Sequence, residues 1–262
     1  MSKQYLPGGE PFEFGSGGAG VLVLHGFTGS PFEVRALGEA LHREGFSVFG
    51  PALAGHATDE SHLESTTADD YFAEIERAYA DARKRCERLY AVGLSMGGTL
   101  ALHLAAVHHL PGVVTVSTPV FLYPMVAASV PVLHQWMPGL RTPANFAAWQ
   151  GNVVGYKSAS IASVNEIVRV FDRVRTGLHR VRSPLLVLHS TRDLTVPVAS
   201  AHEIHEKAAS EVKRMELIDA GSHLMTVEPN LSLIRSQIVD FLKERERSAG
   251  RPEGRKRRSP EP

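Results

Sequence analysis

Short apolar runs alternate with amphipathic segments along most of the chain. The first run, residues 21–24, is bounded by a glycine and is typical of a strand buried on both faces. After it, Ser30-Pro31 favours a helix start, apolar residues recur at helical spacing, and Gly45 favours a helix end. The pattern predicts strands at residues 20–25, 46–50, 89–94, 113–117, 185–189 and 212–218. It predicts helices between residues 30 and 45 and at residues 67–86, 95–109, 197–208 and 228–246.

Strands that alternate with helices of this length indicate βαβ units with right-handed crossovers. No internal repeat is visible, so the chain is expected to form a single α/β domain. We therefore predict a mostly parallel, doubly wound sheet built from residues 1–118 and 181–247.

Residues 119–180 separate two of these strands and are too numerous for a simple crossover. Their first half is rich in apolar residues and proline and holds both tryptophans, Trp136 and Trp149. Their second half, residues 160–178, has the spacing of an amphipathic helix. An apolar insertion at the carboxyl edge of a parallel sheet lies where such sheets bind ligands. We interpret it as a cap or lid over a site; a helical subdomain with no role in binding is the alternative.

Composition narrows the class of protein. The chain has 262 residues, of which 43% are hydrophobic and 21% charged, with 28 basic and 28 acidic side chains. These fractions suit a globular protein and disfavour collagen, coiled coil and wholesale disorder. The single cysteine, Cys86, excludes an intrachain disulfide and a cysteine-cluster metal site.

The balanced charge conceals a basic C-terminal tail. Residues 248–262 carry five basic and two acidic side chains, a net charge of +3, which leaves −3 on the rest of the chain. This segment has prolines and glycines but no aliphatic residue beyond Ala249, so we expect a disordered, solvated tail. A tether to nucleic acid or to a membrane surface is the alternative.

No targeting segment is evident. The N-terminal residues lack the apolar core of a signal peptide, and no run reaches the roughly 18–20 apolar residues of a membrane-spanning helix. We expect a cytoplasmic protein with no stable membrane anchor.

The sequence Gly93-Leu94-Ser95-Met96-Gly97 fits the pattern Gly-x-Ser-x-Gly. It follows an apolar strand and directly precedes a helix, which is the context of a nucleophile elbow. The glycines on either side allow the tight turn, and the helix start favours a developing negative charge. Ser95 is therefore the candidate nucleophile; a serine that only caps a helix is the alternative.

A serine nucleophile needs a base and an orienting acid. In this topology the chain order is serine, acid, histidine, each after a strand. Asp193 follows the strand at 185–189 and His223 follows the strand at 212–218, which places both at the same edge of the sheet as Ser95. Asp219 is a less suitable acid because it lies only four residues before His223.

Other histidines are less well placed. His25 ends a strand but precedes Ser95, so a structural hydrogen bond is expected for it, and His189 lies within a strand and is expected in the core. His56 lies in a loop near the site and could be structural or part of its rim. No histidine pair has metal-ligand spacing with a third ligand nearby, so we expect no metal.

An oxyanion hole needs two convergent backbone N–H groups. Met96 follows the nucleophile and supplies one candidate. The other comes from the loop after the first long strand, where Gly26 permits a sharp turn and Phe27 can supply both an N–H and an apolar wall.

Together these segments resemble the α/β-hydrolase superfamily, and more narrowly its bacterial carboxylesterase and monoacylglycerol lipase family with a small lid. The matching segments are residues 22–30, residues 93–98, the Asp193 loop and residues 221–223. The resemblance implies an α/β-hydrolase fold, cytosolic esterase activity and no cofactor. It also implies Ser95 as nucleophile, Asp193 as acid, His223 as base, and Phe27 and Met96 as oxyanion and substrate contacts. Where the family commonly has Gly-His-Gly, this chain has Gly55-His56-Ala57.

The leading hypothesis is a serine hydrolase that cleaves esters of uncharged, medium- to long-chain acyl groups, such as monoacylglycerols, through an acyl-enzyme. A generic short-chain carboxylesterase, thioester or C–C bond hydrolysis, and a non-catalytic ligand receptor are the alternatives, because one fold hosts many functions. The expected partner is a small ester, with no nucleic acid; the oligomeric state is left open.

Overall fold

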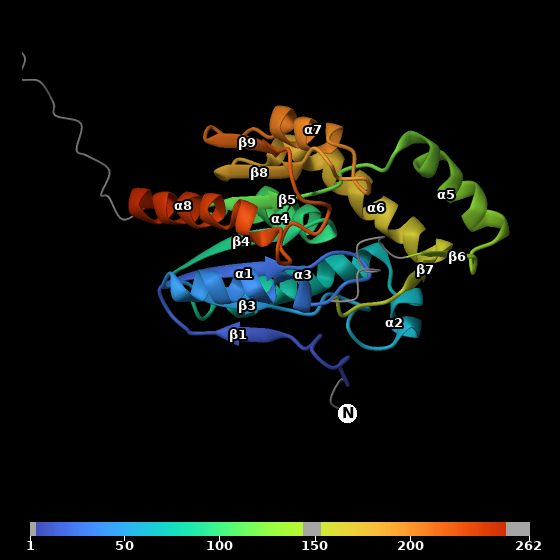
Figure 1. Cartoon of the computed structure of the whole chain (residues 1–262), viewed down its shortest axis with the longest axis horizontal. Coiled ribbons are helices and arrows are strands. Elements are labelled where there is room, and N and C mark those ends of the chain that lie inside the picture. The colour runs from blue at the N-terminus through green and yellow to red at the C-terminus, as the bar shows by residue number, and fades with distance from the viewer. Residues whose placement is uncertain (1–3, 144–152, 250–262) are drawn as a thin grey trace, which may run out of the picture.

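The predicted parallel sheet is present and has seven strands. The computed structural model describes residues 4–143 and 153–249. The strands are β1 (Phe12–Phe14), β2 (Ala19–Leu24), β3 (Ser47–Gly50), β4 (Arg88–Leu94), β5 (Val113–Val116), β8 (Leu185–Ser190) and β9 (Lys213–Ile218). They lie in the order β1-β3-β2-β4-β5-β8-β9, with β1 antiparallel to β3 and all other neighbours parallel (Figure 1). This is the expected α/β-hydrolase fold.

Helices cover both faces of the sheet (Figure 1). One face is covered by α1 (Phe32–Arg43) and α8 (Leu231–Ala249), and the other by α3 (Ala68–Arg83), α4 (Met96–His108) and α7 (Ala199–Lys207). Successive residues of β2 point to opposite sides, so Val21 and Val23 contact the first group while Leu22 and Leu24 contact the second. Burial on both faces explains why the strand sequences are continuously apolar.

Helix boundaries agree with the sequence to within a few residues. Thr67 forms the expected cap of α3, in a capping box with Asp70. The helix ends at Arg83, three residues before the predicted Cys86. Helix α8 begins at Leu231 rather than at residue 228 and continues to Ala249, so the first two residues of the predicted tail are helical. The rest of that tail, residues 250–262, lies outside the described residues.

Several elements were not predicted. They are β1, α2 (Glu60–Glu64), α5 (Pro124–Trp136), β6 (Arg141–Pro143), β7 (Ser158–Ser160) and the 3-10 turn η2 (Leu178–Arg180). Strand β1 shows why: it has three residues, too few for a periodic signal, and depends on tertiary packing. The Phe12 ring occupies the space that a Cβ on Gly38 or Gly50 would need.

The insertion at residues 119–180 contains two unlike helices. Helix α6 (Ile161–Gly177) buries Ile167, Val170 and Phe171 in the same core cluster as α4. Helix α5 is more apolar, yet Val130 is its one buried residue, whereas Met125 and Trp136 are 87% and 76% exposed. In Figure 1 α5 lies at the periphery, away from the main sheet. Trp149, part of the predicted apolar half, lies outside the described residues.

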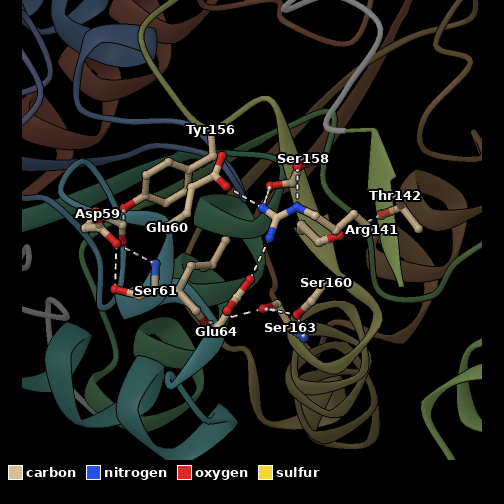
Figure 2. Close-up of polar contacts among 12 residues, drawn as sticks. Asp59, Glu60, Ser61, Glu64, Arg141, Thr142, Tyr156, Ser158, Ser160 and Ser163 are labelled. Atoms are coloured by element: carbon tan, nitrogen blue, oxygen red, sulfur yellow. Dashed lines mark hydrogen bonds and ion pairs between the residues drawn. The ribbon is translucent and has the colours of Figure 1, made fainter. Parts of the chain in front are cut away.

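Polar contacts join the base of the insertion to α2 (Figure 2). From β6, the Arg141 guanidinium donates to Ser158 Oγ at 2.8 Å and to Glu64 Oε1 at 2.6 Å, and it also pairs with Glu60. The Tyr156 hydroxyl lies 2.9 Å from the Gly55 carbonyl oxygen and 3.0 Å from the Asp59 carbonyl oxygen. These contacts connect the segments that follow α5 to α2 and to the loop before it.

Candidate active site

Ser95 lies at the end of β4, the central strand of the sheet. Its backbone has φ 53° and ψ −124°, a left-handed region that is costly for a residue with a side chain. Its N–H donates to the Val116 carbonyl oxygen at 2.8 Å, and helix α4 begins at the next residue, Met96. The strand, turn and helix have the geometry of a nucleophile elbow.

The glycines around Ser95 are required by close backbone contacts. A Cβ on Gly93 would overlap the backbone of Gly97, and one on Gly97 would overlap the carbonyl groups that end β2. A Cβ on Gly98 would overlap the Thr118 side chain. The elbow can pack this tightly against β2 because these positions have no side chain.

Asp193 and His223 are in direct contact at the same edge of the sheet. His223 Nδ1 lies 2.7 Å from Asp193 Oδ2, and Asp193 Oδ1 accepts the Thr195 and Val196 N–H groups at 2.8 and 3.0 Å. Both side chains are buried. Burial by itself would raise the pKa of Asp193, but the hydrogen bond and charge of His223 and the two backbone donors lower it overall. The carboxylate is therefore ionised and able to orient the imidazole.

Asp219, the less suitable acid, points elsewhere. Its exposed carboxylate accepts from Thr191 Oγ1 and from Arg192 Nε, each at 3.1 Å. These bonds lower its pKa. The structure thus pairs His223 with Asp193, as the sequence predicted.

The competing histidines have structural positions. His25 is fully buried, with Nδ1 2.9 Å from the Gly26 carbonyl oxygen, and its Nε2 accepts the Leu53 N–H at 3.1 Å. His189 is buried in β8 with Nε2 3.2 Å from the Val196 carbonyl oxygen, and burial lowers its pKa. The expectations for both residues are confirmed. His56 is 2% exposed, which makes it structural rather than part of the rim.

The loop after β2 lies directly against the elbow. The position that a Gly26 Cβ would occupy is 3.4 Å from Ser95 Cβ. Across the part of the chain that the structure describes, no acceptor pairs with the Phe27 N–H. Met96 is the first residue of α4, and the first N–H groups of a helix have no acceptor within it. Gly26 therefore lies against Ser95, and the Phe27 and Met96 N–H groups stay the predicted oxyanion donors.

Two buried histidines support this loop as neutral side chains. Burial lowers the pKa of His25 to about 3 and that of His56 to about 4. His56 Nε2 accepts the Thr28 N–H at 3.0 Å, and its Nδ1 lies 2.7 Å from the Ala54 carbonyl oxygen. Ala57, which stands where the family commonly has glycine, has φ 58° and so keeps the left-handed turn. The departure from Gly-His-Gly leaves that turn in place.

Glu33 is a buried acid at this site that the sequence analysis missed. It lies in the first turn of α1, is 5% exposed, and accepts the Gly26 N–H on Oε2 at 2.9 Å. Burial raises its pKa to about 7, although the Gly26 hydrogen bond and the charge of His223 act in the opposite direction. An acidic residue in a first helical turn ordinarily indicates an exposed position, so the sequence carried no signal of this contact.

Neither a cluster of metal ligands nor a membrane-spanning helix occurs in the described residues. In residues 4–143 and 153–249 no three His, Cys, Asp or Glu side chains gather as a metal site would require. Over the same ranges no helix is both long enough and apolar enough to span a bilayer.

The fold and the elbow define an α/β-hydrolase, and comparison with known proteins agrees. A family model described as serine aminopeptidase, S33 (Hydrolase_4) matches residues 17–230, and the chain belongs to this family. The chain is 32% identical to a thermostable monoacylglycerol lipase of Bacillus sp. (strain H-257), over 92% of this chain and 98% of that protein. It is 24% identical to a carboxylesterase of Bacillus subtilis (strain 168), over 89% and 96%.

Solved structures of lipolytic enzymes have the same fold. A chain from the work on LipS and LipT, two metagenome-derived lipolytic enzymes, superposes with a TM-score of 0.83 at 27% identity, covering 92% of this chain and all of that one. The monoacylglycerol lipase of Paleococcus ferrophilus gives 0.75 at 20% identity, covering 90% and 98%. The family membership and the 32% identity to a monoacylglycerol lipase over most of the chain support ester hydrolysis as the activity.

Proposed function

We propose that this protein is a serine hydrolase that cleaves esters of uncharged, medium- to long-chain acyl groups, with monoacylglycerols as the first candidate substrates. The observation that carries the proposal is the buried 2.7 Å contact between His223 and ionised Asp193, at the sheet edge where Ser95 adopts its strained turn. Relatives named as a monoacylglycerol lipase and a carboxylesterase support the same chemistry.

In the proposed reaction His223 Nε2 takes the proton of the Ser95 hydroxyl while Ser95 Oγ bonds to the ester carbonyl carbon. The negative charge that forms on the carbonyl oxygen is stabilised by the Phe27 and Met96 N–H groups. The C–O bond to the alcohol then breaks, and His223 returns the proton to the departing oxygen. Water then attacks the acyl carbon as His223 takes its proton. The bond between Ser95 Oγ and the acyl carbon breaks, His223 returns the proton to Ser95 Oγ, and the carboxylic acid leaves.

The apolar insertion supports the choice of substrate. We propose that α5 and the segments around it form the cap over residues 95, 193 and 223. Helix α5 carries His134 as its only ionisable side chain, so it offers an acyl chain an apolar surface without a fixed charge. Such a surface favours uncharged acyl chains over charged esters.

Ser95→Ala is the first test. We expect loss of hydrolysis of p-nitrophenyl esters and loss of covalent labelling by a fluorophosphonate, while Ser232→Ala, on the exposed side of α8, keeps both. A Ser95→Ala protein that retained more than a few per cent of the wild-type rate would contradict the assignment. Absence of fluorophosphonate labelling in the wild-type protein would favour a ligand receptor instead.

A chain-length series separates the ester hypotheses. Monoacylglycerols with acyl chains of increasing length are compared with alkyl esters of the same acids by kcat/KM. A preference for longer chains together with the glycerol group supports the proposal, and a profile independent of the alcohol indicates a generic carboxylesterase. Parallel assays with thioesters test the second reaction class.

The cytoplasmic location stays a prediction that cell fractionation checks.

A further inference from the structure

The loop between β2 and α1 has its backbone fixed on both sides of Phe27. The Gly26 N–H donates to Glu33 Oε2 at 2.9 Å, and His25 Nδ1 lies 2.9 Å from the Gly26 carbonyl oxygen. The Thr28 N–H donates to His56 Nε2 at 3.0 Å. Three backbone groups near the Phe27 N–H therefore have a buried side-chain partner: the Gly26 N–H, the Gly26 carbonyl and the Thr28 N–H.

These contacts determine the direction of the Phe27 N–H. It belongs to the same planar peptide as the Gly26 carbonyl, and in a trans peptide the two groups point in opposite directions. His25 fixes that peptide through the carbonyl. The peptide before it, which carries the Gly26 N–H, is fixed by Glu33. Since glycine has the widest backbone freedom of any residue, Gly26 keeps one conformation only if both flanking peptides are held.

Glu33 is in close contact with the loop. A Cβ on Gly29 would overlap the Glu33 carboxyl group, and a Cβ on Gly26 would lie 3.3 Å from Glu33 Oε2 and 3.4 Å from Ser95 Cβ. The Glu33 main chain is itself held, because Thr226 Oγ1 donates to the Glu33 carbonyl oxygen at 2.7 Å. The carboxyl group is thus packed between the start of α1 and the loop, and Gly26 lies between it and Ser95.

We infer that Glu33 is a positioning residue of the oxyanion hole: by accepting the Gly26 N–H it holds Gly26 in the conformation that presents the Phe27 N–H beside Ser95. Glu33 touches no reacting atom and acts through the loop. The inference rests on the proposed function, in which the Phe27 N–H binds the oxyanion. Burying a carboxyl group costs free energy, and this bond gives the buried group a partner.

The experiment compares Glu33→Met with Glu33→Gln. Methionine fills a similar volume but cannot accept the Gly26 N–H, whereas the glutamine amide oxygen can. We expect Glu33→Met to lower kcat by about 10- to 100-fold, less than the 10²–10³ typical of a deleted oxyanion donor, with KM changed by less than about twofold. Affinity for a trifluoromethyl ketone, whose adduct carries an oxyanion, should fall by the same factor. Glu33→Gln should restore both to within about threefold of wild type.

Ser210→Ala is the control, since it removes a buried hydrogen bond to the Ser183 carbonyl oxygen at the amino ends of β8 and β9, the sheet edge opposite Ser95. It should lower Tm and leave kcat unchanged. A folded Glu33→Met protein with wild-type kcat would overturn the inference, as would a Glu33→Gln protein no better than Glu33→Met. If Glu33→Met does not fold, Glu33→Asp, whose carboxylate is one methylene shorter, should show the same loss of kcat, and wild-type kcat in that variant would equally overturn the inference.

A readout independent of activity separates this inference from the proposed function. The Gly26 amide proton should resonate downfield in ¹H–¹⁵N spectra of the wild type and Glu33→Gln, and move upfield in Glu33→Met. An unchanged Gly26 resonance in Glu33→Met would remove the basis of the inference. A wild-type protein that hydrolyses no ester would contradict the proposed function while leaving the Gly26 measurement valid.

Discussion

Asp193 and Glu33 are both buried carboxylic acids at the sheet edge that holds Ser95, yet their pKa values shift in opposite directions. Asp193, in the loop after β8, has a lowered pKa, whereas Glu33, at the start of α1, has a pKa raised to about 7. Burial is the largest influence on each and acts upward on both. The difference therefore comes from what the carboxylate oxygens contact.

The number of hydrogen-bond donors distinguishes the two sites. Asp193 accepts hydrogen bonds from two backbone N–H groups and from His223. Among the described residues, the Glu33 carboxyl group accepts from one donor, the Gly26 N–H. Several donors stabilise the charged form enough to overcome desolvation, and one donor does not. Asp193 thus suits the role of a permanently charged partner for His223, and Glu33 that of a hydrogen-bond acceptor.

The largest effect is expected from Asp193→Asn. It keeps the size of the side chain but removes the charge and permits the wrong imidazole tautomer, so kcat should fall by about 10⁴-fold while the fold persists. Steady-state kinetics and far-UV circular dichroism measure the two properties. Asp219→Asn, on the exposed neighbour bonded to Arg192, should leave kcat within about twofold. If Asp219→Asn were the damaging change, Asp193 would not be the acid.

His56→Phe tests whether the neutral, buried His56 side chain supports the loop after β2. The ring volume is largely kept, but the buried Thr28 N–H loses its acceptor, which should cost about 1–3 kcal/mol of unfolding free energy in urea titrations. The esterase kcat should fall as well, since Thr28 adjoins Phe27. Replacing the exposed His62 in the same way should change stability by less than about 0.5 kcal/mol. Equal effects of the two substitutions would contradict a supporting role for His56.

The raised pKa of Glu33 predicts an unusual pH dependence of stability. The folded protein holds the Glu33 proton up to about pH 7, whereas the unfolded chain releases it near 4.5. The stability linked to this proton is complete below about pH 4.5 and is lost as the pH rises through 7. Glu33→Gln carries no such proton. Its free energy of unfolding, measured by urea titration, should therefore exceed that of the wild type by on the order of 1–3 kcal/mol at pH 8.5, and should not exceed it at pH 4.5. A wild type more stable than Glu33→Gln at pH 8.5 would reverse the sign and contradict the raised pKa.

Exposed carboxylates provide the contrast to both buried ones. Glu60 and Glu64 pair with Arg141, and all three side chains are about 40% exposed (Figure 2). Arg141→Gln should therefore cost less than about 1 kcal/mol, and less still in high salt. Because Arg141 joins the insertion to α2, KM for long-chain esters should change more than KM for p-nitrophenyl acetate. Arg169→Gln, an exposed ion pair within α6, serves as the control; identical KM profiles for the two variants would argue against a link between this network and the substrate.

Much of the fold and of the site could be predicted from local sequence. The strand that ends at Leu94, the glycines around Ser95 and the order of Ser95, Asp193 and His223 are all features of chain segments, so they could be identified without coordinates. Strand β1 could not, because three residues carry no period and its Phe12 ring packs against Gly38 and Gly50, residues distant in the chain. The exposure of α5 was also not predictable, since an apolar helix sequence ordinarily indicates burial.

The sequence by itself determined the strand and helix pattern and the candidate residues for catalysis, because hydrophobic period, glycine placement and strand order are local properties. The tertiary structure decided the environment of each residue: two backbone N–H groups and His223 surround Asp193, His56 accepts the Thr28 N–H, and Glu33 contacts Gly26. Burial and the donors around a carboxyl group are supplied by segments distant in sequence. Two acids that look alike in the chain therefore acquire opposite pKa shifts only when the sheet brings those segments together.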